Sequence, residues 1–264
     1  MTYLMESSTE GARLKAKTDR AVVAEELRLC GLRTGDRALE AGCASGAVAE
    51  VVADLVGAQG RVLGVDRSEA RLLEATASAR LRAAAAPANL DYLRGDIAQL
   101  PLRTGGLDFV LCRLVLEYTR DPLPLVRELV RVTRPGGRVV LADVDGYGSF
   151  HHGLTAERQA AIDAVQGLLK KSGFDPFAGR KLFGMMRQAG VEKVEVHLRP
   201  YHLVAGAASE GVLSNWLYKL ETLAPLGRKV LGAAWEGHAA AMMDHLRDPE
   251  TLTYSVLFLA VGTR

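Results

Sequence analysis

The chain has 264 residues, of which 48% are hydrophobic and 24% are charged, and its formal net charge is +2. This composition is typical of a globular protein and excludes a wholly disordered chain. The basic residues are scattered and the isoelectric point is only about 8.4, so we expect no nucleic-acid-binding surface. The length is sufficient for one large α/β domain with a sizeable core.

The three cysteines, Cys30, Cys43 and Cys112, are odd in number and form no CxxC motif. We therefore expect neither a disulfide framework nor a bound metal, and a reducing compartment such as the cytoplasm. The first ten residues contain two acids and lack the apolar core of a signal peptide. The apolar run 252–261 has about half the ~20 residues that a membrane span requires, so no membrane segment is expected.

Short apolar strands and amphipathic helices alternate over the first half of the chain. Strands are expected at 37–40, 61–65, 90–93, 107–112 and 138–142, and helices at 18–31, 47–55, 68–85 and 123–132. This alternation is typical of a parallel sheet covered by helices on both faces. Right-handed crossovers place the carboxyl ends of the strands along one edge, where ligands bind.

The rhythm changes after residue 145. Helices are expected at 155–172, 179–189 and 209–247, the last with interruptions at Pro225 and Gly237, and strands at 191–198 and 253–261. We predict a single domain over 1–264 with a helical leader at 1–31 and helical insertions at 146–178 and 205–250. These insertions are expected to cover the ligand edge of the sheet as a lid.

A glycine-containing loop, residues 42–46, joins the first strand to the next helix. Gly42 and Gly46 permit a tight turn and close approach of the backbone to a ligand, although such a loop also occurs as a simple strand-to-helix turn. Glu40 precedes the loop and suits an ammonium group, whereas a phosphate would be repelled there. The loop is also a poor dinucleotide fingerprint, which disfavours a nicotinamide enzyme.

Two further acids follow the next two strands. Asp66 lies where a doubly wound fold holds a ribose diol, about 20 residues after the glycine loop; the alternative is an acid that stabilises a helix N-terminus. Asp96 and the aliphatic Ile97 suit an adenine amino group and ring; the alternative is an ordinary loop acid. Three such features at successive strand ends are far more specific than any one alone.

Six sequence segments carry a resemblance to a known family. They are LEAGCASG, VLGVDRS, GDIAQLP, LDFVLCRLVLEY, LVRELVRVTRPGGRVVLADVD and GRKLFGMMRQAGV. The chain resembles class I S-adenosylmethionine-dependent methyltransferases of the small-molecule, type 11 or ubiquinone- and menaquinone-biosynthesis kind, strongly over 33–145 and moderately over 179–199. The resemblance implies a Rossmann-like, doubly wound α/β sheet of seven mostly parallel strands with an antiparallel last strand, and S-adenosyl-L-methionine as the cofactor.

The resemblance also implies roles for individual residues. Glu40 engages the amino end of the methionine, Asp66 the ribose hydroxyls, and Asp96 with Ile97 the adenine. The implied cofactor-binding residues are Tyr3, Arg13, Glu40, Gly42, Cys43, Ala44, Gly46, Asp66, Arg67, Asp96, Ile97, Arg113 and Leu114. Arg113 and Leu114 act through their backbone, and Tyr3 with Arg13 belongs to a leader that folds over the cofactor or is a frayed terminus. The family usually has Gly where this chain has Ala44, and often Asp where it has Glu40.

Candidate catalytic residues follow the fifth strand. Methyl transfer from a sulfonium is an in-line displacement in which the protein aligns the nucleophile and excludes water, and a hydroxyl nucleophile of high pKa needs a base. We predict His151, His152 and Tyr147 for this role, the alternative for the histidines being an exposed loop pair. For Tyr201 and His202 a structural role is favoured over a place in the pocket floor.

The sequence as a whole predicts methyl transfer from S-adenosyl-L-methionine to a small-molecule acceptor at oxygen, nitrogen or carbon, inside a lid-covered site. An RNA or protein methyltransferase is the first alternative, against which the near-neutral charge argues. The second is a non-catalytic S-adenosylmethionine-binding protein, because the motifs report cofactor binding rather than transfer.

Overall fold

The computed structural model describes residues 18–83 and 89–264, except for the side chains at 82, 83 and 147–149. Within these residues a seven-stranded sheet has the order β3-β2-β1-β4-β5-β7-β6. Its strands are β1 (Arg37–Ala41), β2 (Arg61–Asp66), β3 (Leu90–Arg94), β4 (Leu107–Arg113), β5 (Thr133–His152), β6 (Lys193–Ala205) and β7 (Leu252–Thr263). The pairs among β1 to β5 are parallel, whereas β7 runs antiparallel to β5 and β6. The predicted doubly wound sheet with an antiparallel last strand is confirmed.

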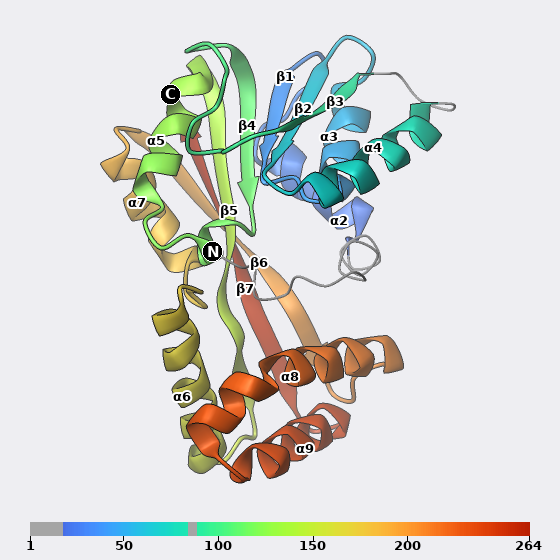
Figure 1. Cartoon of the computed structure of the whole chain (residues 1–264), viewed down its shortest axis with the longest axis vertical. Helices are drawn as coiled ribbons and strands as arrows, with labels where there is room; N and C mark the ends of the chain where they lie inside the picture. Colours follow the sequence, from blue (N-terminus) through green and yellow to red (C-terminus); the bar gives the residue numbers. More distant parts are fainter. Residues whose placement is uncertain (1–17, 84–88) are drawn as a thin grey trace.

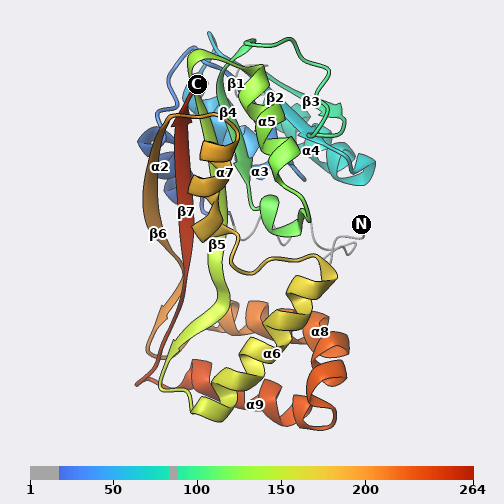
Figure 2. The ribbon, with the colours of Figure 1, turned by 90° about the vertical axis from the view of Figure 1, so that its left-hand side faces the viewer.

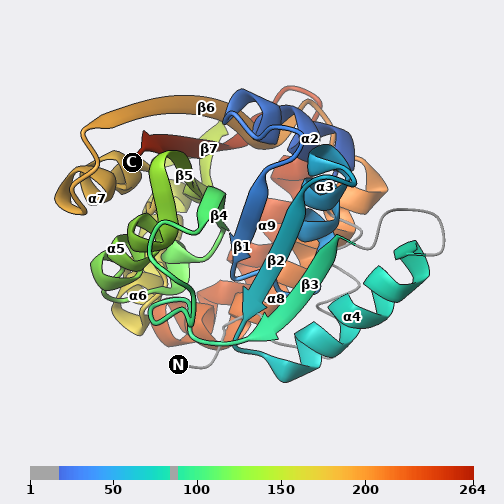
Figure 3. The same ribbon diagram turned by 90° about the horizontal axis from the view of Figure 1, so that it is seen from above.

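Helices cover both faces of this sheet (Figures 1 and 3). They are α2 (Arg20–Leu29), α3 (Ala47–Val56), α4 (Glu69–Ala83), α5 (Leu123–Val132), α6 (Ala156–Ser172), α7 (Leu182–Gln188), α8 (Glu210–Leu231) and α9 (Ala234–Arg247), with single 3₁₀ turns at η1 (Leu116–Tyr118) and η2 (Gly179–Lys181). Buried side chains of α2 and α3 share one core cluster with the sheet, and those of α5 and α7 share another. The two clusters lie on opposite sides of the strands.

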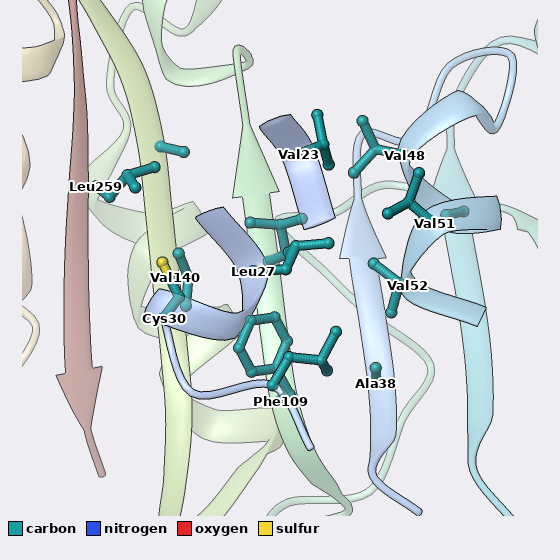
Figure 4. Packing of buried hydrophobic residues seen from close by; sticks show 14 of the residues in the cluster. Val23, Leu27, Cys30, Ala38, Val48, Val51, Val52, Phe109, Val140 and Leu259 are labelled. Atoms are coloured by element: carbon teal, nitrogen blue, oxygen red, sulfur yellow. The ribbon is translucent and has the colours of Figure 1, made fainter. Parts of the chain in front are cut away.

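Apolar packing fixes α2 against α3 and the sheet (Figure 4). Val23 and Leu27 of α2 are each 3% exposed and share a cluster with Val48 of α3 and with Phe109 of β4. Burying a side chain of this size stabilises the fold by about 1.5–3 kcal/mol. The helix begins at the N-cap Asp19, whose carboxylate accepts hydrogen bonds from two backbone N–H groups. This packing brings α2 next to the glycine loop.

The strand β5 continues well beyond its predicted end at Ala142 and reaches His152. Acidic residues and a glycine after Ala142 break the apolar pattern, but pairing with β7 resumes at Phe150 and continues to the end of the strand. With β6 and β7, this strand forms an extension of the sheet that carries α6, α8 and α9 at its far end (Figures 1 and 2). We call these three helices the helical module.

The helical module has its own core, which includes Trp216, Trp235 and Leu246. The predicted interruptions at Pro225 and Gly237 are wrong, because α8 passes through Pro225 and α9 contains Gly237. The break lies instead at Gly232, which has a φ of +58°. Pro225 has no backbone N–H to donate within the helix. The packing of buried residues on both sides of it keeps α8 continuous.

Replacement of Gly227 tests the packing of this module. A Cβ atom at Gly227 would overlap the ring of Trp235, so Gly227→Ala is expected to lower the free energy of unfolding by about 1–3 kcal/mol. Denaturant titration followed by tryptophan fluorescence measures this, because the chain has two tryptophans and both lie in the module core. The matched control is Gly211→Ala in the same helix, where nothing lies within 4 Å of the added atom. Equal loss of stability in both variants would contradict the packing described.

Candidate active site

The carboxyl ends of β1, β2 and β4 meet at one edge of the sheet and line a cavity of about 720 Å³. Ten of the predicted cofactor-binding residues line it: Glu40, Gly42, Cys43, Ala44, Asp66, Arg67, Asp96, Ile97, Arg113 and Leu114. Gly46 is buried behind the lining, at the N-terminus of α3. Tyr3 and Arg13 lie outside the described residues. A volume of this size is ordinary for a small-molecule site.

The glycine loop is tightly constrained. Gly42 has a φ of +82°, and a Cβ atom there would lie 2.5 Å from a methyl group of Val115. The backbone N–H groups of Gly42 and Cys43 both donate to the carbonyl of Val65, at 2.7 and 3.1 Å. At Gly46 a Cβ atom would overlap the hydroxyl of Tyr92. Glycine is therefore required at both ends of the loop for physical reasons.

The carboxylate of Asp66 connects this loop to the start of the next crossover. Its Oδ2 accepts a hydrogen bond from the backbone N–H of Ala44 at 2.9 Å, and its Oδ1 accepts one from Ser68 at 2.9 Å. Each oxygen retains the capacity to accept a further hydrogen bond. The arrangement suits a pair of neighbouring hydroxyl groups, as in a ribose diol.

Glu40 is a buried acid at the base of the cavity, with 4% of its surface exposed. Burial raises the pKa of its carboxyl group to about 8, although Arg113 and the backbone N–H of Ala49 oppose the shift. Within the described part of the chain, its Oε2 is buried and has no hydrogen-bond partner. Such an acceptor is costly to leave unsatisfied and is well placed for a ligand cation.

Arg113 is the counterpart of Glu40 in the same cavity. Its guanidinium lies 3.4 Å from the carboxylate of Glu26 on α2, and its buried Nε has no partner among the residues that the structure describes. The sequence indicated a backbone role for Arg113 and gave no role to Glu26. The one sequence feature that could have indicated Glu26 is the presence of an acid on the apolar face of α2.

Three buried carboxyl groups surround Arg113 among the residues that the structure describes. Burial raises the pKa of Glu26, and it raises the pKa of Asp143 to about 7, while Arg113 opposes the shift at both groups and at Glu40. Asp143 is fully buried and accepts hydrogen bonds from the backbone N–H groups of Glu117 and Val144. The base of the cavity therefore favours a positively charged ligand.

Backbone strain is concentrated around the same cavity. In the described ranges, the non-glycine residues with positive φ are Ala44 at +45°, Leu114 at +57° and His202 at +51°. All three line the cavity. A left-handed conformation at a non-glycine residue costs of order 1–3 kcal/mol and is typical of ligand sites.

The predicted catalytic histidines lie elsewhere. His151 and His152 pair with β7 in the extension, and Nδ1 of His151 is 2.8 Å from the hydroxyl of Thr253. The ring of His151 also contacts that of His245, so it faces the helical module. Neither histidine lines the cavity, because the continued strand β5 carries them away from the ligand edge. The side chain of Tyr147 lies outside the described residues.

Two residues for which a structural role was favoured do line the cavity. Tyr201 and His202 of β6 form part of its wall, so that preference is corrected. The sequence could place them on or just beyond a strand, but it could not show that the edge strand β6 reaches the site.

No helix within residues 18–83 and 89–264 combines the length and apolarity needed to cross a membrane.

Comparison with known proteins agrees with this geometry. Residues 39–141, which contain the glycine loop, Asp66 and Asp96, match the family described as "Methyltransferase domain". Over these residues the chain is similar to this methyltransferase family, in agreement with the resemblance to class I S-adenosylmethionine-dependent methyltransferases.

Particular relatives and one solved structure extend the comparison. The 2-phytyl-1,4-naphtoquinone methyltransferase of Synechococcus elongatus is 36% identical over 112 residues, which are 42% of this chain and 47% of that protein. The arsenite methyltransferase of Aquipseudomonas alcaligenes is 28% identical over 198 residues, 74% of this chain and 57% of that protein. The match spans less than two thirds of either relative. A SAM-dependent methyltransferase from Aquifex aeolicus shares the fold with a TM-score of 0.56, 14% identity and coverage of 97% and 98% of the two chains.

Replacement of Ala44 tests the strain in the loop. Ala44→Gly relieves a left-handed conformation worth ~1–2 kcal/mol, and the greater freedom of glycine in the unfolded chain offsets part of this gain. We expect a net increase of up to about 1 kcal/mol in the free energy of unfolding, and a decrease for Ala44→Val, because β-branched residues tolerate positive φ poorly. Denaturant titration measures both. A glycine variant less stable than the valine variant would contradict this account.

The pKa of Glu40 predicts a pH dependence of stability. Its value of about 8 in the folded chain lies above the ordinary value of 4.5, so its contribution is full below pH 4.5 and is lost as pH rises to about 8. Glu40→Gln should therefore change the slope of unfolding free energy against pH, by ~2–4 kcal/mol between pH 5 and 8 relative to the unmodified chain. Glu26 and Asp143 are retained in both proteins and serve as the internal control. Parallel curves would contradict the assignment.

Proposed function

We propose that this chain transfers the methyl group of S-adenosylmethionine to a small-molecule acceptor. The observation that carries the proposal is the pairing of a buried acceptor, Glu40 Oε2, with a buried donor, Arg113 Nε, at the base of one cavity. The amino-acid end of the cofactor has an ammonium group and a carboxylate, which complement these two atoms. In this arrangement the side chain of Arg113 binds the cofactor, in addition to its backbone.

The nucleoside end fits the remaining acids. Each carboxylate oxygen of Asp66 accepts one backbone hydrogen bond, and its remaining lone pair accepts a hydrogen bond from a ribose hydroxyl. Asp96 accepts the backbone N–H of Ala98 with its Oδ1, which turns the loop, and Ile97 lies half-buried beside it. The carboxylate of Asp96 faces the adenine amino group and Ile97 packs on the ring. The positions of Gly42 and Gly46 keep the backbone close to the bound molecule.

The bound cofactor supplies a methyl group activated by a positively charged sulfur. The residues of this chain bind and orient it, and the carboxyl groups of Glu26, Glu40 and Asp143 stabilise its positive charge. Apolar residues of α2 and of the loop after β4, among them Val23 and Val115, exclude water from the reacting atoms. The rate gain comes mainly from alignment of the acceptor with the methyl group.

The part of the cavity that we assign to the acceptor is lined by apolar side chains and favours a small apolar molecule. Its lining includes Val22 and Val23 on α2, Leu125 on α5, and Val144 and Tyr201 on the sheet extension. The Synechococcus elongatus relative is named for a naphthoquinone, which agrees with an aromatic acceptor. The buried carboxyl groups at the base of the site would repel a nucleic-acid phosphate, so we assign no nucleic-acid partner.

Arsenite, the acceptor that the name of another relative gives, fits this cavity less well. Arsenic(III), like other soft ions, prefers thiolate ligands. Cys43 is the one cysteine in the lining, and burial raises the pKa of its thiol, as it does for Cys112. Cys30 and Cys112 are buried away from the cavity.

The proposal keeps a single domain and the cytoplasm as the location, in line with three free, buried thiols. We do not assign a lid role to α6, α8 and α9, because these helices contribute none of the residues that line the cavity. Any effect of the helical module on the cavity is then transmitted through the sheet extension formed by β5, β6 and β7.

Asp66→Asn tests cofactor binding. The amide matches the carboxylate in shape but loses its charge and one acceptor, so we expect S-adenosylhomocysteine to bind about 10- to 100-fold more weakly in calorimetry. Asp91→Asn, an exposed acid on the neighbouring strand β3, is the matched control and should bind normally. Equal affinity of the Asp66 variant and the unmodified chain would contradict the proposed site.

Methyl transfer itself is tested with cofactor labelled in the methyl group. Incubation with a metabolite extract is expected to label molecules that enter an organic solvent, at a rate that falls with Asp66→Asn. Label in RNA or protein would instead support a macromolecular acceptor. Tight binding of S-adenosylhomocysteine without any transfer would support a non-catalytic binding protein.

A further inference from the structure

Two side chains of opposite charge line the same cavity without bonding to each other. Glu40 Oε2 and Arg113 Nε are both buried, and neither has a hydrogen-bond partner among the described residues. The guanidinium is nevertheless close enough to oppose the rise in the pKa of Glu40. A hydrogen bond between such groups is charge-assisted and strong, and leaving both unsatisfied is costly. Another contact must therefore keep the guanidinium away from Glu40.

Glu26 on α2 makes that contact. Its carboxylate is buried and accepts a hydrogen bond from Nη2 of Arg113 at 3.4 Å. The two side chains are 6% and 14% exposed, so water competes little for the ion pair. Arg199 of β6 also attracts Glu26, but it forms its own ion pair with Glu25 of the same helix, at 2.5 Å. Within the described ranges, the side-chain hydrogen bond of Glu26 is the one to Arg113.

The helix holds Glu26 in a fixed position. Val23 and Leu27 lie on either side of it along α2, are each 3% exposed, and pack α2 on the sheet (Figure 4). Burial of an acid beside such residues is unfavourable, and an apolar side chain would serve the packing at least as well. The acid is therefore best explained by its effect on Arg113.

We propose that Glu26 is a positioning residue that holds the guanidinium of Arg113 away from Glu40, an inference that rests on the proposed methyl transfer. Held in this way, the exposed part of Arg113 meets the carboxylate of the cofactor, and Glu40 meets its ammonium group. Without Glu26, the guanidinium turns toward Glu40, and the two side chains neutralise each other. Glu26 thus favours nucleosides that carry a zwitterionic amino-acid tail over nucleosides that lack one.

The test compares two ligands by calorimetry on the full chain. S-adenosylhomocysteine has the amino-acid tail, whereas methylthioadenosine has the same nucleoside and sulfur without it. Glu26→Leu removes the acceptor and keeps a helix-forming, apolar side chain at a buried position. This variant should bind S-adenosylhomocysteine about tenfold more weakly, or worse, and change its affinity for methylthioadenosine by less than about twofold. Glu26→Gln retains an oxygen acceptor for Arg113, so the loss should be only about threefold.

The matched control is Glu50→Leu. Glu50 of α3 is also a largely buried acid, with 13% of its side chain exposed, and it pairs with Arg20 of α2 at 3.3 Å. It does not line the cavity. Loss of an ion pair on α2 is thereby tested without a change at Arg113, and the ratio of the two affinities should stay as in the unmodified chain.

The outcomes distinguish this inference from the proposed function. The positioning role is overturned if Glu26→Leu binds S-adenosylhomocysteine as tightly as the unmodified chain or more tightly, if it loses both ligands equally, or if the unmodified chain prefers neither ligand. Cofactor binding stands in each of these cases. If Glu26→Leu does not fold, Glu26→Gln decides, and an unchanged ratio of affinities overturns the role. If the unmodified chain binds neither ligand, the proposed function itself is overturned.

Discussion

The electrostatic balance around Arg113 is the constraint on which the rest of the site depends. Three buried carboxyl groups, on Glu26, Glu40 and Asp143, interact with the guanidinium of Arg113, which lines the cavity at the carboxyl edge of the sheet together with Glu26 and Glu40. In a poorly solvated site such a cluster cannot be fully ionised, and burial therefore raises all three pKa values. A ligand that carries a positive charge restores the balance. A chain of almost zero net charge can therefore contain a pocket whose buried acids favour a positively charged ligand.

Much of this architecture could be predicted from local sequence. Glu40, Asp66 and Asp96 lie at or just after the carboxyl ends of three strands that are neighbours in the sheet, so strand periodicity and the polarity of the connecting loops were enough to place them at one edge. Gly42 and Gly46 identified the tight turn between β1 and α3. These features are encoded over short distances along the chain, where propensity and alternation are informative.

The contacts that were missed join residues far apart in the sequence. Glu26 and Arg113 are 87 residues apart, and their pairing follows from the packing of α2 on the sheet. The position of His202 depends on a register shift between β6 and β7, where β6 has one extra residue, and such a shift leaves no alternation signal in the sequence. The position of His151 away from the cavity has the same origin, because β5 is extended by pairing with β7 on a stretch whose acids interrupt the apolar pattern. Tertiary pairing outweighed local propensity in each case.

Strain and unsatisfied polar groups at one cavity have a common energetic meaning. The left-handed residues Ala44, Leu114 and His202 lower the stability of the unliganded fold, as do the buried atoms of Glu40 and Arg113 that lack partners in the described part of the chain. A ligand that pairs with those atoms binds only the folded chain and stabilises it by an amount that grows with the logarithm of its concentration relative to Kd. The apolar cluster of α2, α3 and the sheet supplies the stability that permits this arrangement. The packing of this cluster thus offsets the cost of strain and of unsatisfied polar groups at the cavity.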